Sequence, residues 1–453
     1  MRNRTAALAA GSVASFLVPF MMSAVAITLP VVQTELGATA VELSWVAGSY
    51  ILALAAILLP VGRLADIWGR RRTFVWGTAA FTVFSMCAAM AWSVASLVFL
   101  RVVQGVGAAM ILTTGVAIVT DTFPREERGK AMGILVACVY LGLSVGPLAG
   151  GLVTDLAGWR SVFFLGLPPG LACLALAARI EGEWRPAEGE RFDALGSLYY
   201  SSSVVCFVNG LTGLASPERG LPLLAGAAAL GTLFVLRSRR AAHPVIDLSL
   251  FTANRVFVLS SLATLVNYAG TFAVGFLLSL YLQVVKGFSP MNAGFVLVVQ
   301  PVVQSLLSPL AGLLSDRFNA AAMASLGMGL CALGLFAVCG VDAATSLWTI
   351  GGILAVLGLG FALFASPNMS VIMGSVQPRH YSIASSLVGT MRTFGMSLSM
   401  GIATVVFGFL LHGRQVGPET VPQFLASMHI IFAVCAVLCV LGVFCSLGRV
   451  RGD

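Results

Sequence analysis

The stretch Gly62-Arg63-Leu64-Ala65-Asp66-Ile67-Trp68-Gly69-Arg70-Arg71-Arg72 lies between two apolar runs, Ser44–Leu59 and Thr73–Ala91. Its two glycines permit a tight turn and a close approach of backbones. Asp66 can accept hydrogen bonds from neighbouring helix ends, and the arginines can meet that carboxylate or anionic lipid. The alternative interpretation is a basic loop at a membrane surface with one incidental acid. Both interpretations predict a charged turn between two membrane-spanning helices.

The composition places the whole chain in the membrane class. Of its 453 residues, 58% are hydrophobic and 10% are charged, and the mean hydropathy is +0.96. A soluble domain carries about 25% charged residues, and a disordered chain needs low hydrophobicity. The nine cysteines lie in apolar runs without a CxxC pair, which excludes a secreted disulfide scaffold. We therefore expect an all-α polytopic membrane protein.

A membrane-spanning helix needs about 20 apolar residues, and about fourteen runs of that kind occur. The first could pass for a signal peptide, but it is long, lacks a convincing cleavage site and is followed by further spans. The expected spans are Ala6–Leu29, Ser44–Leu59, Thr73–Ala91, Ser96–Thr120, Ala131–Val153, Ser161–Ala178, Ala194–Leu214, Leu221–Leu236, Val256–Leu282, Met291–Leu314, Ala320–Val341, Leu347–Ile372, Ile383–Leu411 and Phe424–Leu447.

Two long polar interruptions, about residues 179–193 and 237–255, bracket the seventh and eighth spans and leave six on either side. The predicted domains are an N-terminal six-helix bundle (1–180), two linking helices with their loops (181–254) and a C-terminal six-helix bundle (255–453). A weak internal echo of Gly62–Asp66 at Gly312–Arg317 supports two parallel halves.

The basic residues predict the orientation. Most of the 26 lysines and arginines fall in the segments that are cytoplasmic if the amino terminus is inside. An even number of spans then returns the carboxyl terminus to the cytoplasm of a plasma-membrane protein. The net charge of +8 forms no continuous basic stripe, so a nucleic-acid partner is not expected.

One arginine falls inside an apolar run, in Leu100-Arg101-Val102-Val103-Gln104-Gly105-Val106-Gly107. A charge in hydrocarbon is costly and usually faces a cavity or a partner, and Gln104 lies one turn further on the same face. The alternative interpretation is an Arg101 side chain that extends to the membrane surface.

The fifth run contains Gly142-Leu143-Ser144-Val145-Gly146-Pro147-Leu148-Ala149-Gly150-Gly151. Glycines at every fourth position make a smooth helix face for close contact with another helix, and the proline bends the segment. This pattern is equally consistent with a plain packing face that has no role in gating.

These three segments, in this order, resemble the signature loop, membrane arginine segment and antiporter segment of the major facilitator superfamily. Flanking residues resemble its fourteen-helix drug–proton antiporter branch over nearly the whole chain, namely Trp45, Tyr50, Gly158-Trp159-Arg160, Phe192-Asp193, Pro244-Val245-Ile246-Asp247-Leu248 and Gly287-Phe288-Ser289-Pro290.

The resemblance implies a major facilitator fold, in which two six-helix bundles and two linking helices surround a midplane cavity and rock between inward-open and outward-open states. A latch on the inward face is then expected at Gly62, Arg63, Asp66, Gly69, Arg70 and Arg71. Arg101 and Gln104, with Asp155 and Arg392, are expected in the cavity or in coupling. A seam that limits leak is expected at Gly142, Gly146, Pro147, Gly150 and Gly151.

One departure concerns proton coupling. Antiporters of this branch carry an acid in the first helix, where this chain has Met21, and Ala26 replaces an Asn. None of the acids lies inside a predicted span, so an edge acid such as Asp66 or Asp155 is left to carry a proton. The intramembrane charge is positive, which predicts a preference for anionic, zwitterionic or neutral amphiphiles over permanent cations.

Four uncharged polar residues are further candidates for the substrate cavity: Asn267, Tyr268, Gln300 and Gln304. Hydrogen bonds between helices are an equally good explanation for each of them.

We therefore expect a secondary active exporter of small amphiphilic compounds, driven by protons and functional as a monomer in the bilayer. A dedicated single-metabolite transporter, facilitative or coupled to another ion, is the alternative, and a membrane receptor or sensor is the alternative outside transport. The sequence predicts no enzyme, cofactor or metal site, because it shows no nucleophile–base or ligand cluster and no GxxxxGK[ST] loop.

Overall fold

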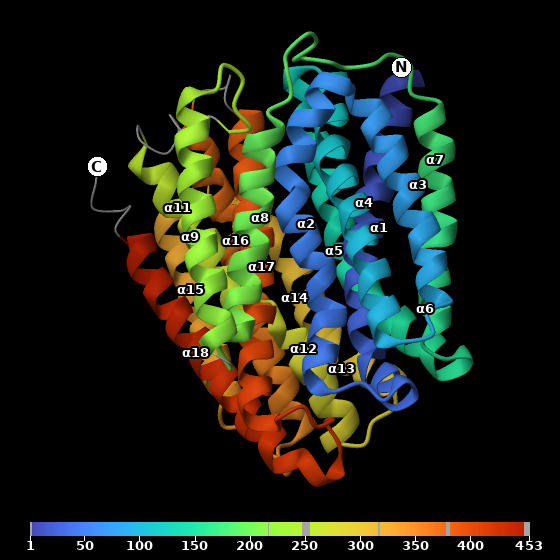
Figure 1. Ribbon diagram of the computed structural model, residues 1–453, viewed down its shortest axis with the longest axis vertical. Coiled ribbons are helices and arrows are strands. Elements are labelled where there is room, and N and C mark those ends of the chain that lie inside the picture. The colour runs from blue at the N-terminus through green and yellow to red at the C-terminus, as the bar shows by residue number, and fades with distance from the viewer. Residues whose placement is uncertain (1, 216, 247–253, 316–317, 377–380, 448–453) are drawn as a thin grey trace. The chain divides into compact units, whose positions relative to one another are not determined.

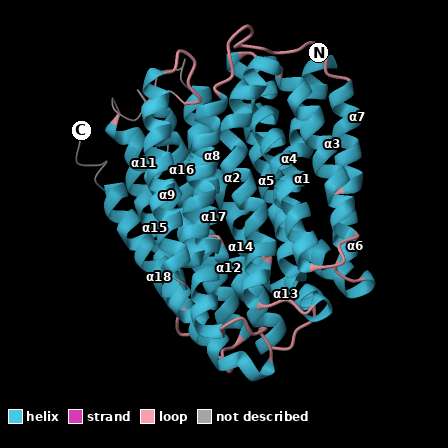
Figure 2. Cartoon of the chain, in the orientation of Figure 1, coloured by secondary structure: helices cyan, strands magenta, loops and turns pink. Residues whose placement is uncertain are grey.

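The computed structural model describes residues 1–453 except 1, 216, 247–253, 316–317, 377–380 and 448–453. Every regular element in the described residues is helical (Figures 1 and 2). The chain divides into two compact units, residues 1–38 with 45–247 and residues 39–44 with 248–453. Asp316 and Arg317 of the internal echo lie outside the described residues.

The first unit contains the signature turn and both linking helices. Its elements are α1 (Arg2–Leu36), α2 (Ala40–Trp68, whose first turn groups with the second unit), α3 (Arg70–Ala89), α4 (Val94–Thr122), α5 (Arg125–Ala157), α6 (Arg160–Phe164), α7 (Leu167–Ala178), α8 (Ala194–Thr212), η1 (Gly213–Ala215) and α9 (Pro217–Arg240).

The second unit begins after the second polar interruption. Its elements are α11 (Arg255–Thr271), α12 (Ala273–Leu280), the π-helical η2 (Tyr281–Val285), α13 (Pro290–Leu297), α14 (Val299–Ser315), α15 (Ala320–Val338), α16 (Leu347–Gly374), α17 (Tyr381–Leu411), η4 (Pro418–Thr420) and α18 (Val421–Leu447).

Polar residues start many of these helices at the positions where backbone amides lack a partner. Ser93 and Ser96 form a reciprocal capping box at α4. Asn254 accepts from the Phe257 amide at α11, and Ser289 precedes Pro290 at α13. The loop composition therefore accounts for several of the helix boundaries.

The predicted count of fourteen spans is not confirmed. Twelve helices among the described residues are long and apolar enough to cross a membrane, and α3 and α8 are not among them. The three arginines at the start of α3 and the hydroxyl residues of α8 lower their hydropathy. In α3, Thr78 and Thr82 are buried, and their hydroxyls donate to the Phe74 and Thr78 carbonyls of the same helix, both at 2.8 Å.

Three predicted spans are interrupted. The sixth is divided into α6 and α7 at Gly166. The ninth is divided at Phe272, where the Ala273 amide donates to the Ser399 hydroxyl at 3.1 Å. The tenth is divided at Val298, because Pro301 has no N–H to offer the Leu297 carbonyl.

The same pattern of helix packing occurs in each unit. In the first, α1 packs against α4, α5 and α7, and α3 packs against α4 and α7. In the second, α11 packs against α16, α17 and α18, and α15 packs against α16 and α18. Helices α1, α3, α4, α5 and α7 therefore correspond to α11, α15, α16, α17 and α18, as in a repeated six-helix plan.

The glycine face of α5 lies directly on the backbone of α1. A methyl group added at Gly142 would lie 2.5 Å from the Phe16 carbonyl oxygen, and one added at Gly150 would lie 2.7 Å from that of Ala24. These contacts leave no room for a Cβ, so the glycines set the distance between the two helices. Pro147 lies inside the same helix.

We expect Gly142→Ala to lower the free energy of unfolding by about 1–3 kcal/mol, because the methyl group meets backbone rather than a flexible side chain. Gly133→Ala in the same helix is the matched control, since nothing lies within 4 Å of its added methyl. That change should raise stability by about 0.5–1 kcal/mol through helix propensity. Unfolding of both variants in detergent micelles measures this, and shifts of the same sign would contradict the packing argument.

Candidate functional site

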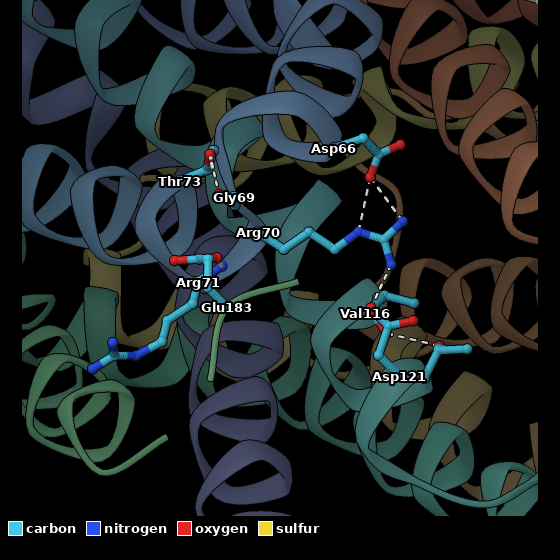
Figure 3. A network of polar contacts seen from close by, with 9 residues as sticks. Asp66, Gly69, Arg70, Arg71, Thr73, Val116, Asp121 and Glu183 are labelled. Carbon is cyan, nitrogen blue, oxygen red and sulfur yellow. Dashed lines mark hydrogen bonds and ion pairs between the residues drawn. The ribbon is translucent and has the colours of Figure 1, made fainter. Parts of the chain in front are cut away.

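The signature turn joins three helix ends through one arginine. Gly69 separates α2 from α3 and has a φ of 129°, which a residue with a side chain rarely adopts. Arg70 then extends between two carboxylates: its Nη2 lies 2.7 Å from Asp66 of α2, and its Nη1 lies 2.6 Å from Asp121 of α4 (Figure 3). The ends of α2, α3 and α4 are thereby tied together.

These ion pairs outweigh the cost of burial. Burial by itself lowers the pKa of Arg70, but the carboxylates of Asp66 and Asp121 more than offset it, so the pKa lies above the usual value for arginine. The guanidinium therefore stays charged whenever the turn is formed.

Glu183, from the loop after α7, caps α3 across the chain. Gly69 at the N-cap has no side chain to accept from the first amides of the helix. The Glu183 carboxylate accepts instead from the Arg71 amide at 2.8 Å (Figure 3). It also accepts from the Arg72 amide at 3.3 Å and lies 3.8 Å from the Arg72 Nε. A negative charge at this end also suits the helix dipole.

The same loop is bonded along its length to the turn. The Arg70 amide donates to the Trp184 carbonyl at 3.0 Å, and the Ala187 amide donates to the Asp66 carbonyl at 3.1 Å. Its first residues are bonded to α1, where Asn3 exchanges two hydrogen bonds with the Glu181 backbone at 3.0 and 2.9 Å. Residues 181–187 thus bond the signature turn to the start of α1.

Glu190 connects the turn to the loop after α9. Its carboxylate forms a close ion pair with Arg63 of α2, and the same Oε2 lies 2.8 Å from Nδ1 of His243. Two predicted members of the latch, Asp66 and Arg70, therefore bond to each other, while Arg63 and Arg71 bond to the loop after α7.

Arg101 does not extend to the membrane surface. Its side chain is 1% exposed, and its guanidinium stacks over the Tyr50 ring with Cζ 4.2 Å from the centroid. Nη1 donates to Gln104 Oε1 at 2.6 Å and Nε donates to the Val46 carbonyl at 3.4 Å. The alternative of an arginine at the lipid surface is thereby excluded, and the roles predicted for Arg101 and Gln104 remain predictions.

The other predicted coupling residues lie elsewhere. Asp155 is exposed in the last turn of α5, and Arg392 is half-buried in α17. Met21, where an acid was expected from the resemblance, is fully buried, and a methyl added at Gly166 would lie 3.1 Å from its sulfur. That position is occupied by tight apolar packing.

The four candidate cavity residues belong to the second unit. Asn267 is fully buried beside the Cys331 thiol of α15, and the Tyr268 ring meets Phe361 of α16 edge-on at 5.2 Å. Gln300 is half-buried and Gln304 is buried. Their contact with a substrate stays a prediction. No group of three potential metal ligands occurs in the part of the chain that the structure describes.

The model of the Major Facilitator Superfamily matches residues 11–400 and 260–451. The chain is 29% identical over 426 residues to the riboflavin transporter RibZ of Clostridioides difficile, covering 93% of this chain and 92% of that protein. It is 30% identical over 392 residues to a multidrug resistance protein B homolog of Mycobacterium tuberculosis, covering 84% and 72%.

The fold is also that of a solved transporter. The crystal structure of a bacterial homolog of the human lysosomal transporter Spinster aligns with a TM-score of 0.68 at 16% identity, covering 99% of this chain and 97% of that one. At this identity the likeness establishes the fold alone.

Sequence reasoning did not find Glu183, Glu190 and His243, because their loops read only as polar interruptions. The charges of these loops could have indicated the contacts. Acids in the loop after α7 face a run of arginines about 110 residues earlier, and opposite charges at membrane edges tend to pair.

We expect Glu183→Ala to lower the stability of the first turn of α3 by about 1 kcal/mol, the usual value of an N-terminal cap. The amides of Arg71 and Arg72 should then exchange with deuterium several-fold faster. Glu188→Ala is the matched control, because Glu188 lies in the same loop and pairs on the surface with Arg185. Equal acceleration in both variants would show that the loop, and not the cap, protects these amides.

Proposed function

Because the chain belongs to the major facilitator superfamily, we propose that it is a secondary active transporter that exports small amphiphilic compounds by alternating access, driven by a proton gradient. The observation that carries this proposal is the family match across the chain together with a multidrug resistance relative aligned over 84% of it. We place the protein in the cell membrane as a monomer with both termini in the cytoplasm.

The signature turn supplies a latch for such a cycle. Alternating access needs rigid bundles whose ends form and release contacts. Asp66, Arg70 and Asp121 fix the relative positions of three helix ends, and Glu183 holds the start of α3. In the proposed cycle this cluster moves as one body on the cytoplasmic face.

Energy in this proposal comes from an ion gradient, because the sequence has no phosphate-binding loop for a nucleotide. With Met21 in place of an acid, the expected first span, Ala6–Leu29, contains no titratable side chain. We therefore assign proton transfer to an edge acid, Asp66 or Asp155. Asp155 is the more accessible to water, and Asp66 is already held by Arg70.

A dedicated metabolite transporter is the second candidate. It is favoured by the similarity to RibZ, which spans 93% of this chain and 92% of that protein. A single-substrate carrier should show saturable uptake of one compound with little competition from chemically different amphiphiles, whereas a broad exporter should show mutual competition.

Transport by inverted membrane vesicles tests the proposal. We expect dye accumulation that needs an imposed pH gradient, needs no nucleotide and collapses with an uncoupler. If Asp155 carries the proton, Asp155→Asn should lose accumulation about tenfold but keep downhill dye flux, because only coupling is removed. If Asp66 carries it, Asp66→Asn should lose accumulation about tenfold and also slow downhill flux, because that change breaks the ion pair with Arg70 as well. Glu188→Gln on the exposed loop is the control.

Accumulation that persists in both Asn variants would contradict proton coupling through an edge acid. Uptake that requires ATP, or no uptake of any dye by the wild-type chain, would contradict the proposed function as a whole.

A further inference from the structure

The first unit buries a positive charge that has no acid beside it among the residues that the structure describes. Two charged side chains in the described residues are buried, Arg101 and Asp193. Asp193 is compensated, because it accepts from the Gly196 amide and pairs with Arg237 at 3.1 Å. Arg101 has no ion pair within that part of the chain, and its neighbours are a neutral amide, a ring face and a backbone carbonyl.

An uncompensated buried arginine is costly. Dipoles and a ring face recover part of the hydration energy that the guanidinium loses, but a counter-charge recovers much more. A fold that keeps such a residue in hydrocarbon normally uses it.

Two hydrogen-bond donors around Arg101 have no acceptor. Gln104 directs its Oε1 to the guanidinium, which leaves its buried Nε2 without a partner. The Tyr50 hydroxyl is also buried without a partner, and its ring lies against Arg101. Unmade hydrogen bonds of this kind are rare inside proteins, and here they accompany an unpaired positive charge.

The second unit shows that helix packing does not require these polar residues. In α4, Gly105 contacts the Tyr50 carbonyl, and a methyl added at Gly107 would lie 3.0 Å from the Gly77 carbonyl oxygen. In α16 the same spacing recurs: added methyls at Gly358 and Gly360 would lie 2.5 Å from the Gln300 carbonyl oxygen and 2.8 Å from that of Gly327.

Aligning these two glycine pairs places Leu354 opposite Arg101 and Leu357 opposite Gln104. Both leucines are fully buried. The same helix crossing is therefore built once with aliphatic side chains and once with a charge and an amide. Packing explains the glycines in both units, and it leaves Arg101 and Gln104 unexplained.

We propose that Arg101, Gln104 and Tyr50 form a subsite for the carboxylate of an otherwise apolar substrate, which supplies the counter-charge that no described residue gives to Arg101. This proposal rests on the proposed transport function and names its substrate class. A carboxylate matches the planar guanidinium and accepts from the amide and the phenol at once. A permanent cation would meet an unshielded positive charge at the same place.

Binding of a matched pair of probes to the full-length protein in nanodiscs tests this subsite. Dansyl-phenylalanine carries a carboxylate, and its methyl ester is the neutral equivalent. We expect the wild-type protein to bind the acid at least about tenfold more tightly than the ester, the usual value of charge-assisted hydrogen bonds.

Three variants locate the effect. Gln104→Glu places a carboxylate beside Arg101 and should remove the preference for the acid without changing ester binding. The double change Arg101→Leu with Gln104→Leu copies the second unit and should do the same. Tyr50→Phe keeps the ring and should weaken acid binding about threefold. If the double variant does not fold, the other two still decide.

Arg160→Gln is the control, because Arg160 also stacks on an aromatic ring, that of Trp159, but has Glu35 as its carboxylate partner. It should change binding of neither probe. The subsite would be overturned if the wild-type protein bound acid and ester with equal affinity. It would also be overturned if the variants weakened binding of both probes equally.

The two proposals fail separately. If vesicles take up the ester in a gradient-dependent way but show no preference for the acid, the proposed export function stands and the subsite is overturned. If the protein in nanodiscs prefers the acid but vesicles take up neither probe, the subsite stands and the proposed export function is overturned.

Discussion

The close approach of helix backbones at glycine is the constraint on which the rest of this structure depends. The hydrophobic effect does little to bring helices together in lipid, so contact surface and polar satisfaction must do it. Gly142 and Gly150 place α5 against α1, and Gly105 and Gly358 bring α4 and α16 against the carbonyls of Tyr50 and Gln300. Larger residues at these positions would push these helix pairs apart.

At the membrane edge a different rule applies, because charge can be used freely where water is near. Arg70 is held by two carboxylates, and Glu183 supplies the cap that Gly69 cannot provide. The positive φ of the turn requires a glycine at position 69, and a glycine has no side chain to cap the helix. Another segment must therefore supply the capping group. The loop after α7 is thus part of the signature turn, although more than 100 residues separate them.

The sequence predicted the helical membrane architecture and the family, and it located the signature turn, because these depend on composition and on local spacing. The count of fourteen spans is not confirmed, because α3, which begins with three arginines, and α8, which is rich in hydroxyl residues, are not among the twelve helices apolar enough to cross a membrane. Sequence reasoning missed Glu183 and Glu190, because their partners are set by tertiary structure. It selected Arg101 but could not supply the Tyr50 ring, which belongs to another helix.

Comparing the two units shows which residues helix packing requires and which it does not. Helix crossings with the same glycine spacing occur in both, so selection for packing alone would allow leucine at Arg101 and Gln104 as it does at Leu354 and Leu357. Asn368 in the second unit shows how a buried polar group is normally treated: its amide donates to the Ser260 carbonyl and the Thr264 hydroxyl. Arg101 is treated differently, since its charge is left unmatched. A helix crossing that is aliphatic in one unit and, within the described residues, carries an unpaired arginine in the other is asymmetric for a reason outside folding, and a bound anion is the simplest one that the donors around Arg101 allow.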